Sequence, residues 1–145
     1  MNKLWLYILL FIALAFACRK NSLSPNSTCG YVPAYVDTVI NLDDIALFGL
    51  KSNGFAYIRG GYRGVFIYKL SDHYVAFERA SSYNMATVGC QVKMDKSLFY
   101  LNDTCSGSRF DPSDGAVLKG PAVCPLLEYD VTPYSSNQIR IHYSP

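Results

Sequence analysis

The chain has 145 residues, half of them hydrophobic, and its 13 basic and 11 acidic side chains leave a formal net charge of +2. A balance this close to neutral disfavours nucleic acid as a partner, because nucleic-acid binding needs concentrated positive charge. Beyond residue 33 the chain is long enough for one hydrophobic core and too short for two, so we expect one domain over residues 34–145.

The N-terminus has the pattern of a targeting segment. Lys3 precedes an apolar run over residues 4–16. A membrane-spanning helix needs about 20 apolar residues, so this run suits the core of a signal peptide better. Ala15, Phe16 and Ala17 then lead to Cys18. We therefore predict a signal peptide over residues 1–17.

Small residues directly before a cysteine, at the end of such a run, resemble the signal of a bacterial lipoprotein. The resemblance implies that Cys18 is the lipid-bearing first residue of the mature chain. A membrane is then a partner through the lipid anchor, and the protein lies in the bacterial cell envelope, facing the periplasm or the cell surface. The usual Leu three positions before the cysteine is Ala15 here. The alternatives are cleavage elsewhere, with Cys18 an ordinary thiol, or an uncleaved anchor.

The segment over residues 19–28 is mostly polar, with frequent Ser and Asn and no periodicity. Such a composition favours a solvated chain over a packed one. We expect residues 18–33 to form a lipidated tether that holds the domain away from a membrane surface.

Strand-like runs recur through the rest of the chain. Ile139, Ile141 and Tyr143 alternate with polar neighbours, which is the period of a half-buried strand. The strand candidates are residues 35–42, 55–59, 64–70, 74–79, 88–94, 98–102, 127–132 and 138–143. The turn candidates between them are Ser52-Asn53-Gly54, Gly60-Gly61, Ser71-Asp72 and Asp95-Lys96. Residues 45–50 are either a strand or a loop that covers the core. This pattern predicts an all-β fold, an antiparallel sandwich or small barrel.

A motif series near the C-terminus resembles the second half of a Rieske iron–sulfur domain. The series comprises Gly107-Ser108-Arg109-Phe110-Asp111, Gly115, Gly120-Pro121-Ala122, Pro125-Leu126 and Tyr129. The resemblance covers roughly residues 64–143. It implies a small domain of stacked antiparallel sheets, with a cluster-binding subdomain of two loops and a proline-containing loop that covers it.

The ligands of a Rieske cluster are missing from the matching positions. The family uses Cys-x-His in the first loop and Cys-x-x-His in the second, and the two histidines set the cluster's potential. Asp103 and Ser106 stand at the second pair. Ser81 and Tyr83 stand at the first pair or, in another register, Met85 and Thr87. The two histidines, His73 and His142, lie outside both loops. We therefore expect no cofactor and treat these positions as vestigial.

The cysteines after the signal fit the family in another way. High-potential Rieske proteins join the two cluster loops by a disulfide, and the resemblance implies that Cys90 and Cys105 form this bond. Cys29 and Cys124 then remain as a second pair, and four cysteines in an exported chain suit a disulfide framework. A four-cysteine zinc site is the alternative, although Cys-x-x-Cys spacing is lacking. No recognisable Cys-His arrangement supports catalysis by a thiol.

Three functions follow from this reasoning. The first is a cluster-free Rieske-fold lipoprotein that serves as a binding or structural module, with an envelope protein of unknown identity as its partner and no catalytic role. The second is electron transfer with a [2Fe–2S] cluster on atypical ligands, such as Asp103 with Cys105. The third is an enzyme built on Asp103, Asp111 and Asp114, although Asp-Pro-Ser-Asp-Gly is first a turn sequence. The candidates for exposed aromatic contacts are Tyr62, Tyr83, Phe110 and Tyr134.

Overall fold

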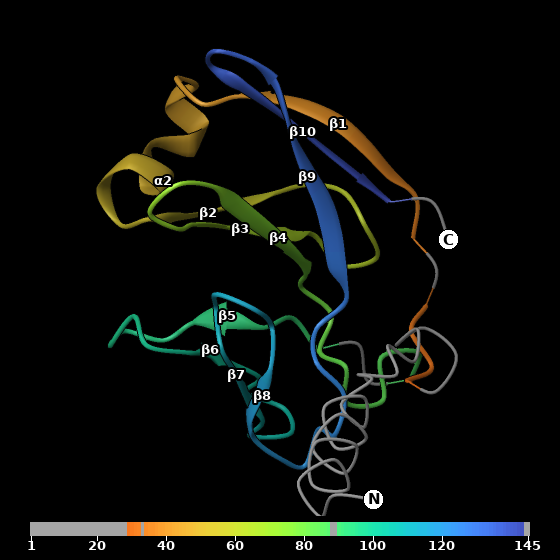
Figure 1. Cartoon of the computed structure of the whole chain (residues 1–145). Coiled ribbons are helices and arrows are strands. Elements are labelled where there is room, and N and C mark those ends of the chain that lie inside the picture. The colour runs from red at the N-terminus through yellow and green to blue at the C-terminus, as the bar shows by residue number, and fades with distance from the viewer. Residues whose placement is uncertain (1–28, 33, 88–89, 144–145) are drawn as a thin grey trace, which may run out of the picture.

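The computed structural model describes residues 29–32, 34–87 and 90–143. The predicted signal peptide, Cys18 and most of the predicted tether lie outside these residues. The described part is mostly β-structure arranged as two antiparallel sheets, and the all-β prediction is confirmed (Figure 1). No helix in this part of the chain is both long and apolar enough to cross a membrane.

The larger sheet has six strands in the order β1-β10-β9-β4-β3-β2. Its strands are β1 (Val36–Asn41), β2 (Phe55–Ile58), β3 (Val65–Lys69), β4 (Tyr74–Glu78), β9 (Glu128–Ser135) and β10 (Gln138–Tyr143). Each neighbouring pair is antiparallel. All six strands overlap runs that the sequence predicts, although β9 extends to Ser135, beyond the end of the predicted run 127–132. The predicted turn at Ser71-Asp72 joins β3 to β4.

The smaller sheet has four short strands in the order β5-β6-β7-β8. They are β5 (Lys93–Met94), β6 (Leu101–Asn102), β7 (Arg109–Phe110) and β8 (Val117–Lys119). The candidates 88–94 and 98–102 are therefore too long. Leu98, in the second of these, lies in a turn with a φ of 64° and donates its N–H to the carbonyl of Asp95. The sequence did not predict β7 and β8, because strands of two or three residues carry no readable period.

Residues 45–50 are neither a strand nor an irregular loop. They form a 3-10 helix, Ile45–Leu47, that continues into the short helix α2 (Phe48–Ser52). The Asp44 side chain caps this start by accepting a hydrogen bond from the N–H of Ala46 at 2.9 Å. Leu47 and Leu50 point into the core, while Ile45 is exposed.

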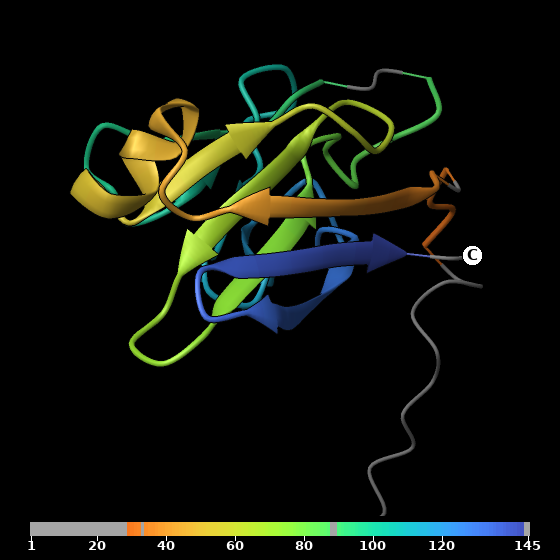
Figure 2. The same cartoon turned by 90° about the horizontal axis from the view of Figure 1, so that it is seen from above.

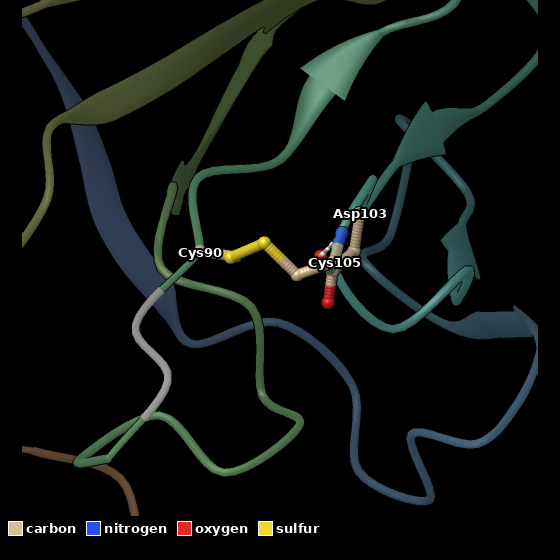
Figure 3. A group of neighbouring side chains, drawn as sticks. All are labelled: Cys90, Asp103 and Cys105. Carbon is tan, nitrogen blue, oxygen red and sulfur yellow. Dashed lines mark hydrogen bonds between the residues drawn. A yellow bond between two sulfur atoms is a disulfide. The ribbon is translucent and has the colours of Figure 1, made fainter.

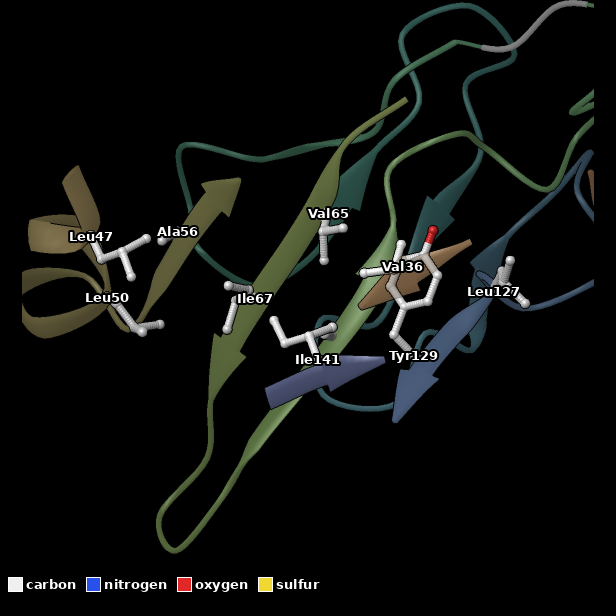
Figure 4. Packing of buried hydrophobic residues seen from close by; sticks show 10 residues of the cluster. Val36, Leu47, Leu50, Ala56, Val65, Ile67, Leu127, Tyr129 and Ile141 are labelled. Carbon is white, nitrogen blue, oxygen red and sulfur yellow. The ribbon is translucent and has the colours of Figure 1, made fainter. Parts of the chain in front are cut away.

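Two hydrophobic cores lie on opposite faces of the central strands. In β3, Val65 and Ile67 face the first core and Phe66 faces the second, so all three side chains are buried. The first core joins residues of β1, β10 and β9 to residues of β2, β3 and α2, and the large sheet therefore curls around it (Figures 2 and 4). The second core lies between β3-β4 and the small sheet. It consists of Phe66, Val75, Phe77, Val92, Leu101, Phe110, Ala122 and Leu126.

Candidate functional site

The candidate site lies where three loops meet beside the small sheet. The first loop, residues 79–92, follows β4, the second loop, residues 103–108, joins β6 to β7, and the proline loop, residues 120–127, joins β8 to β9. A disulfide between Cys90 and Cys105 joins the first two loops, with the Cα atoms 6.2 Å apart (Figure 3). A second disulfide, between Cys29 and Cys124, fixes the start of the domain to the proline loop, with the Cα atoms 5.8 Å apart. The structure thus contains the expected disulfide bonds.

Asp103 organises the second loop. Its side chain is fully buried. One oxygen, Oδ1, accepts the N–H groups of Cys105 at 2.9 Å and Ser106 at 3.3 Å. The other, Oδ2, accepts the hydroxyl of Ser106 at 2.6 Å. The Asp103 carbonyl accepts the N–H of Gly107 at 2.8 Å. The Asp103 carboxylate therefore accepts hydrogen bonds from groups of its own loop.

Ser106 connects this carboxylate to the proline loop. Its Oγ lies 2.8 Å from Oγ of Ser108, which is fully buried, and the two hydroxyls are hydrogen-bonded. The Ser108 hydroxyl in turn accepts the N–H of Ala122 at 2.9 Å. Ser108 belongs to the Gly-Ser motif that carries the family resemblance, yet nothing in the local sequence pattern indicates this bridging role.

Ser81 is the residue of the first loop that lies beside the Asp103 carboxylate. It is fully buried, and its hydroxyl contributes to the lowered pKa of the Asp103 carboxyl group. It also accepts the N–H of Tyr83 at 3.2 Å, and the Tyr83 ring packs against the second core. Met85, by contrast, is buried where its sulfur accepts the N–H of Val32, and Thr87 is exposed. Of the two registers for the first loop, the one with Ser81 and Tyr83 is therefore the one that meets the second loop.

The electrostatics of Asp103 follow from these contacts. Burial raises the pKa of its carboxyl group. The hydrogen bonds from Ser106 and Ser81 and from the N–H groups of Cys105 and Ser106 lower that pKa by more, so the net shift is downward. At neutral pH, Asp103 is thus a buried anion that neutral donors stabilise.

These residues do not fit a Rieske cluster. Such a cluster takes two thiolates and two imidazoles. Ser81, Asp103 and Ser106 offer two hydroxyls and a carboxylate, and the Ser106 hydroxyl donates to that carboxylate. His73 pairs with Asp72 at 2.7 Å in the turn before β4, and His142 lies on β10. Neither of the chain's two imidazoles is therefore near the loops.

One group in the described part of the chain has converging metal-ligand atoms. The Sγ atoms of Cys90 and Cys105 and a carboxylate oxygen of Asp103 all lie within 4.8 Å of one another (Figure 3). Both sulfurs are in the disulfide, so only the carboxylate is a ready ligand. Cys29 and Cys124 are likewise bonded to each other, which leaves the four-cysteine zinc alternative without thiolates.

The remaining acidic candidates shape a turn, and the remaining aromatic candidates are either buried or exposed. Asp111 accepts the N–H of Ser113 at 2.8 Å, and Asp114 accepts the N–H of Ala116 at 2.9 Å, so both carboxylates shape the turn between β7 and β8. Phe110 is fully buried, whereas Tyr62 and Tyr134 are exposed. Asp111 and Asp114 therefore serve a different turn from Asp103, and each carboxylate accepts hydrogen bonds from its own turn.

Comparisons with known proteins identify the architecture. No family model matches the chain, and no curated protein is similar to it. Among solved structures, the plasma membrane Rieske protein PetC3 from the cyanobacterium Synechocystis PCC 6803 is 27% identical with a TM-score of 0.55, and the match covers 72% of this chain and 99% of that one.

Two further solved structures match at lower similarity. The ferredoxin of carbazole 1,9a-dioxygenase from Nocardioides aromaticivorans IC177 is 16% identical with a TM-score of 0.46, over 77% of this chain and 100% of that one. A putative NADH-dependent nitrite reductase small subunit from Mycobacterium tuberculosis is 16% identical with a TM-score of 0.44, and the match covers 77% of this chain and 97% of that one. The similarity to the cyanobacterial protein, together with the two sheets and the disulfide-joined loops, shows that the chain has a Rieske-like fold.

Proposed function

We propose that this protein is a Rieske-fold lipoprotein that has no functional [2Fe–2S] site and serves as a binding or structural module at the cell envelope. The observation that carries the proposal is the buried Asp103 carboxylate, which accepts the hydroxyl of Ser106 at 2.6 Å, at two positions where the family has cluster ligands. Iron at that place would have to displace hydrogen bonds of a buried carboxylate. Breaking such bonds costs about 1.5–3 kcal/mol each.

The direct test is anaerobic reconstitution of the purified protein with iron and sulfide. The expected product is colourless and gives no electron-spin resonance signal after reduction, because two hydroxyls, a phenol and a carboxylate replace two thiolates and two imidazoles. The matched comparison is the variant with Ser81→Cys, Tyr83→His, Asp103→Cys and Ser106→His together. A stoichiometric cluster with a Rieske-like signal in the unmodified protein would refute the proposal.

The alternative is electron transfer with a cluster on atypical ligands. The convergence of Cys90, Asp103 and Cys105 favours it, since three ligand atoms lie within 4.8 Å of one another. Cys90 and Cys105 are bonded to each other, so a thiol reductant must first open that disulfide, and imidazole ligands would still be lacking. The alternative predicts that pretreatment with dithiothreitol makes the reconstituted protein coloured. We therefore do not propose electron transfer for this protein, and we do not propose a catalytic role.

The lipid anchor is a separate part of the proposal. Residues 19–28 join Cys18 to Cys29, whose disulfide lies beside the proline loop. A fully extended chain spans at most about 3.5 Å per residue, so lipid on Cys18 would hold this end of the domain within about 40 Å of the membrane. Intact-mass analysis of the membrane fraction should find an acylated Cys18 as the first residue. Recovery of unmodified protein with another N-terminus would contradict the anchor.

The binding part of the proposal rests on the surface around the loops. The first loop and the proline loop line a hollow of about 410 Å³, and Val123 at its rim is 93% exposed. The partner that we propose for this surface is another protein of the envelope.

A further inference from the structure

A second hollow lies beside the two ends of the first loop, at Arg79 and Gln91. Residues 59–64 between β2 and β3, Arg79 directly after β4, and Gln91 line an open hollow of about 450 Å³. Three arginines, Arg59, Arg63 and Arg79, contribute to its lining, and no aspartate or glutamate does. We call this site the arginine hollow.

A buried glutamate beneath the hollow shapes its loop. Glu78 is fully buried and accepts the N–H groups of Tyr62 at 2.6 Å, Arg63 at 2.8 Å and Ala80 at 2.8 Å. It also accepts the hydroxyl of Tyr129 at 2.5 Å. Four donors therefore occupy its two oxygens, and the carboxylate holds the loop backbone without an ion pair to a guanidinium.

Two of the three guanidinium groups are held in place. Arg79 stacks 4.1 Å from the centre of the Tyr57 ring, and its Nε donates to the carbonyl of Val92 at 3.4 Å. The Arg63 guanidinium lies 5.2 Å from the centre of the Tyr62 ring. Cation–π stacking fixes the plane of a guanidinium and leaves N–H groups at its edge able to donate.

Three guanidiniums line the hollow and one carboxylate, that of the buried Glu78, lies beneath it, so an excess of positive charge remains. None of the ion pairs within the described part of the chain uses one of these arginines. Burial lowers the pKa of Arg79, while Tyr57 and Glu78 oppose this shift. The Arg79 charge is thus partly removed from water, and an anion beside it would restore the lost stabilisation.

We propose that the arginine hollow binds a phosphate-type oxyanion, with the Arg59, Arg63 and Arg79 guanidiniums as donors. Planar guanidinium forks match the oxygen geometry of phosphate, which favours this chemical class. The phosphate is that of a small soluble phosphate ester or of an anionic phospholipid headgroup. The inference does not rest on the state of the cluster positions, although Arg79 and Gln91 belong to the same first loop as Ser81.

The experiment follows the Arg79 side chain in the full chain, purified in nonionic detergent and labelled with nitrogen-15 on arginine. Inorganic phosphate is the soluble probe, and detergent micelles doped with phosphatidylglycerol are the lipid probe, with phosphatidylcholine as the zwitterionic comparison. Saturable shifts of the Arg79 Nε–H resonance with either anionic probe are expected. The shifts should weaken as sodium chloride is raised, because salt screens exposed charges.

Two double variants separate a site from general charge. Arg59→Gln with Arg63→Gln should weaken binding by about tenfold or more, which corresponds to about 1.4 kcal/mol. Arg109→Gln with Lys119→Gln removes the same charge from paired residues of β7 and β8 and should leave affinity unchanged. Arg109 also stacks on a tyrosine, so the comparison is matched to Arg63. An equal loss in both variants, or no saturable shift with either probe, would overturn the proposal.

Discussion

At the scale of single residues, Asp103 shows how an anion can be kept inside a small β domain without a cation. Its two oxygens accept hydrogen bonds from two backbone N–H groups of its own loop and from the Ser106 hydroxyl. Through the hydroxyls of Ser106 and Ser108, the carboxylate is linked to Ala122 of the proline loop, which is distant in sequence. Removing it would leave several buried donors without an acceptor.

We expect Asp103→Ala to lower the free energy of unfolding by about 3 kcal/mol, since buried donors lose their acceptor. Asp103→Asn keeps one acceptor oxygen and should cost about 1 kcal/mol. Urea denaturation at pH 7 measures both. Equal losses in the two variants would show that the charge, and not the hydrogen bonds, accounts for the stabilisation.

The same residue predicts a pH dependence. The folded-state pKa of Asp103 is below its ordinary value, so its ionised form contributes stability that is present above the unfolded-state pKa near 4. That contribution is lost as the pH falls through the folded-state pKa. Between pH 5 and pH 2 the wild type should therefore lose more stability than Asp103→Asn. Parallel losses in the two proteins would contradict the shift.

At the scale of elements, the turn between β7 and β8 determines how the small sheet lies against the large one. Gly115 in this turn has a φ of 70°, and its N–H donates to the carbonyl of Asp111. A Cβ atom there would be 3.0 Å from Cε1 of Phe77, which belongs to β4. The turn and the central strand therefore approach each other closely at this glycine.

Gly115→Ala should be more costly than the same change at Gly107. Both glycines have positive φ, and alanine at such a position costs about 1–2 kcal/mol from backbone strain alone. A Cβ atom at Gly107 would meet nothing within 4 Å, whereas at Gly115 the Phe77 ring must move. We expect about 2 kcal/mol of additional destabilisation at Gly115, measured by thermal unfolding. Equal costs would mean that the second core absorbs the methyl group.

At the scale of the whole molecule, two disulfides connect segments that the sheets alone do not join. The Cys29–Cys124 bond links the start of the domain to the proline loop across a sequence separation of 95 residues. The Cys90–Cys105 bond links the first and second loops across 15 residues. Together they tie the three loops of the candidate site to the body of the domain.

The chain-entropy treatment of disulfides predicts the order of their contributions. Replacing Cys29 and Cys124 by alanine should cost about 4–5 kcal/mol, and replacing Cys90 and Cys105 about 3 kcal/mol, because the longer loop gains more entropy in the unfolded state. Guanidinium denaturation under oxidising conditions measures both. In excess dithiothreitol the two variants and the wild type should converge. The reverse order under oxidising conditions would show that loop length does not control the stabilisation.

Several features of this protein could be predicted because they depend on local sequence. The first half of β9 and the first half of β10 alternate more buried and more exposed residues with a period of two, and such a period is readable from neighbours in the chain. The sequence alone shows that the two cluster loops contain no histidine, because the chain has only His73 and His142 and neither lies in those loops. The resemblance in the Gly-Ser-Arg-Phe-Asp and Gly-Pro-Ala motifs then indicated the architecture.

Only the tertiary structure decided how the replaced positions relate to one another. Ser81 and Asp103 are separated by more than 20 residues, and no period or motif indicates that a serine hydroxyl meets a carboxylate there. The three arginines of the hollow likewise come from two connections that the sheet brings together, the β2–β3 loop and the loop after β4. Side-chain contacts between distant segments depend on how the strands pack and where the loops turn, whereas strand propensity and residue counts are set by the sequence alone.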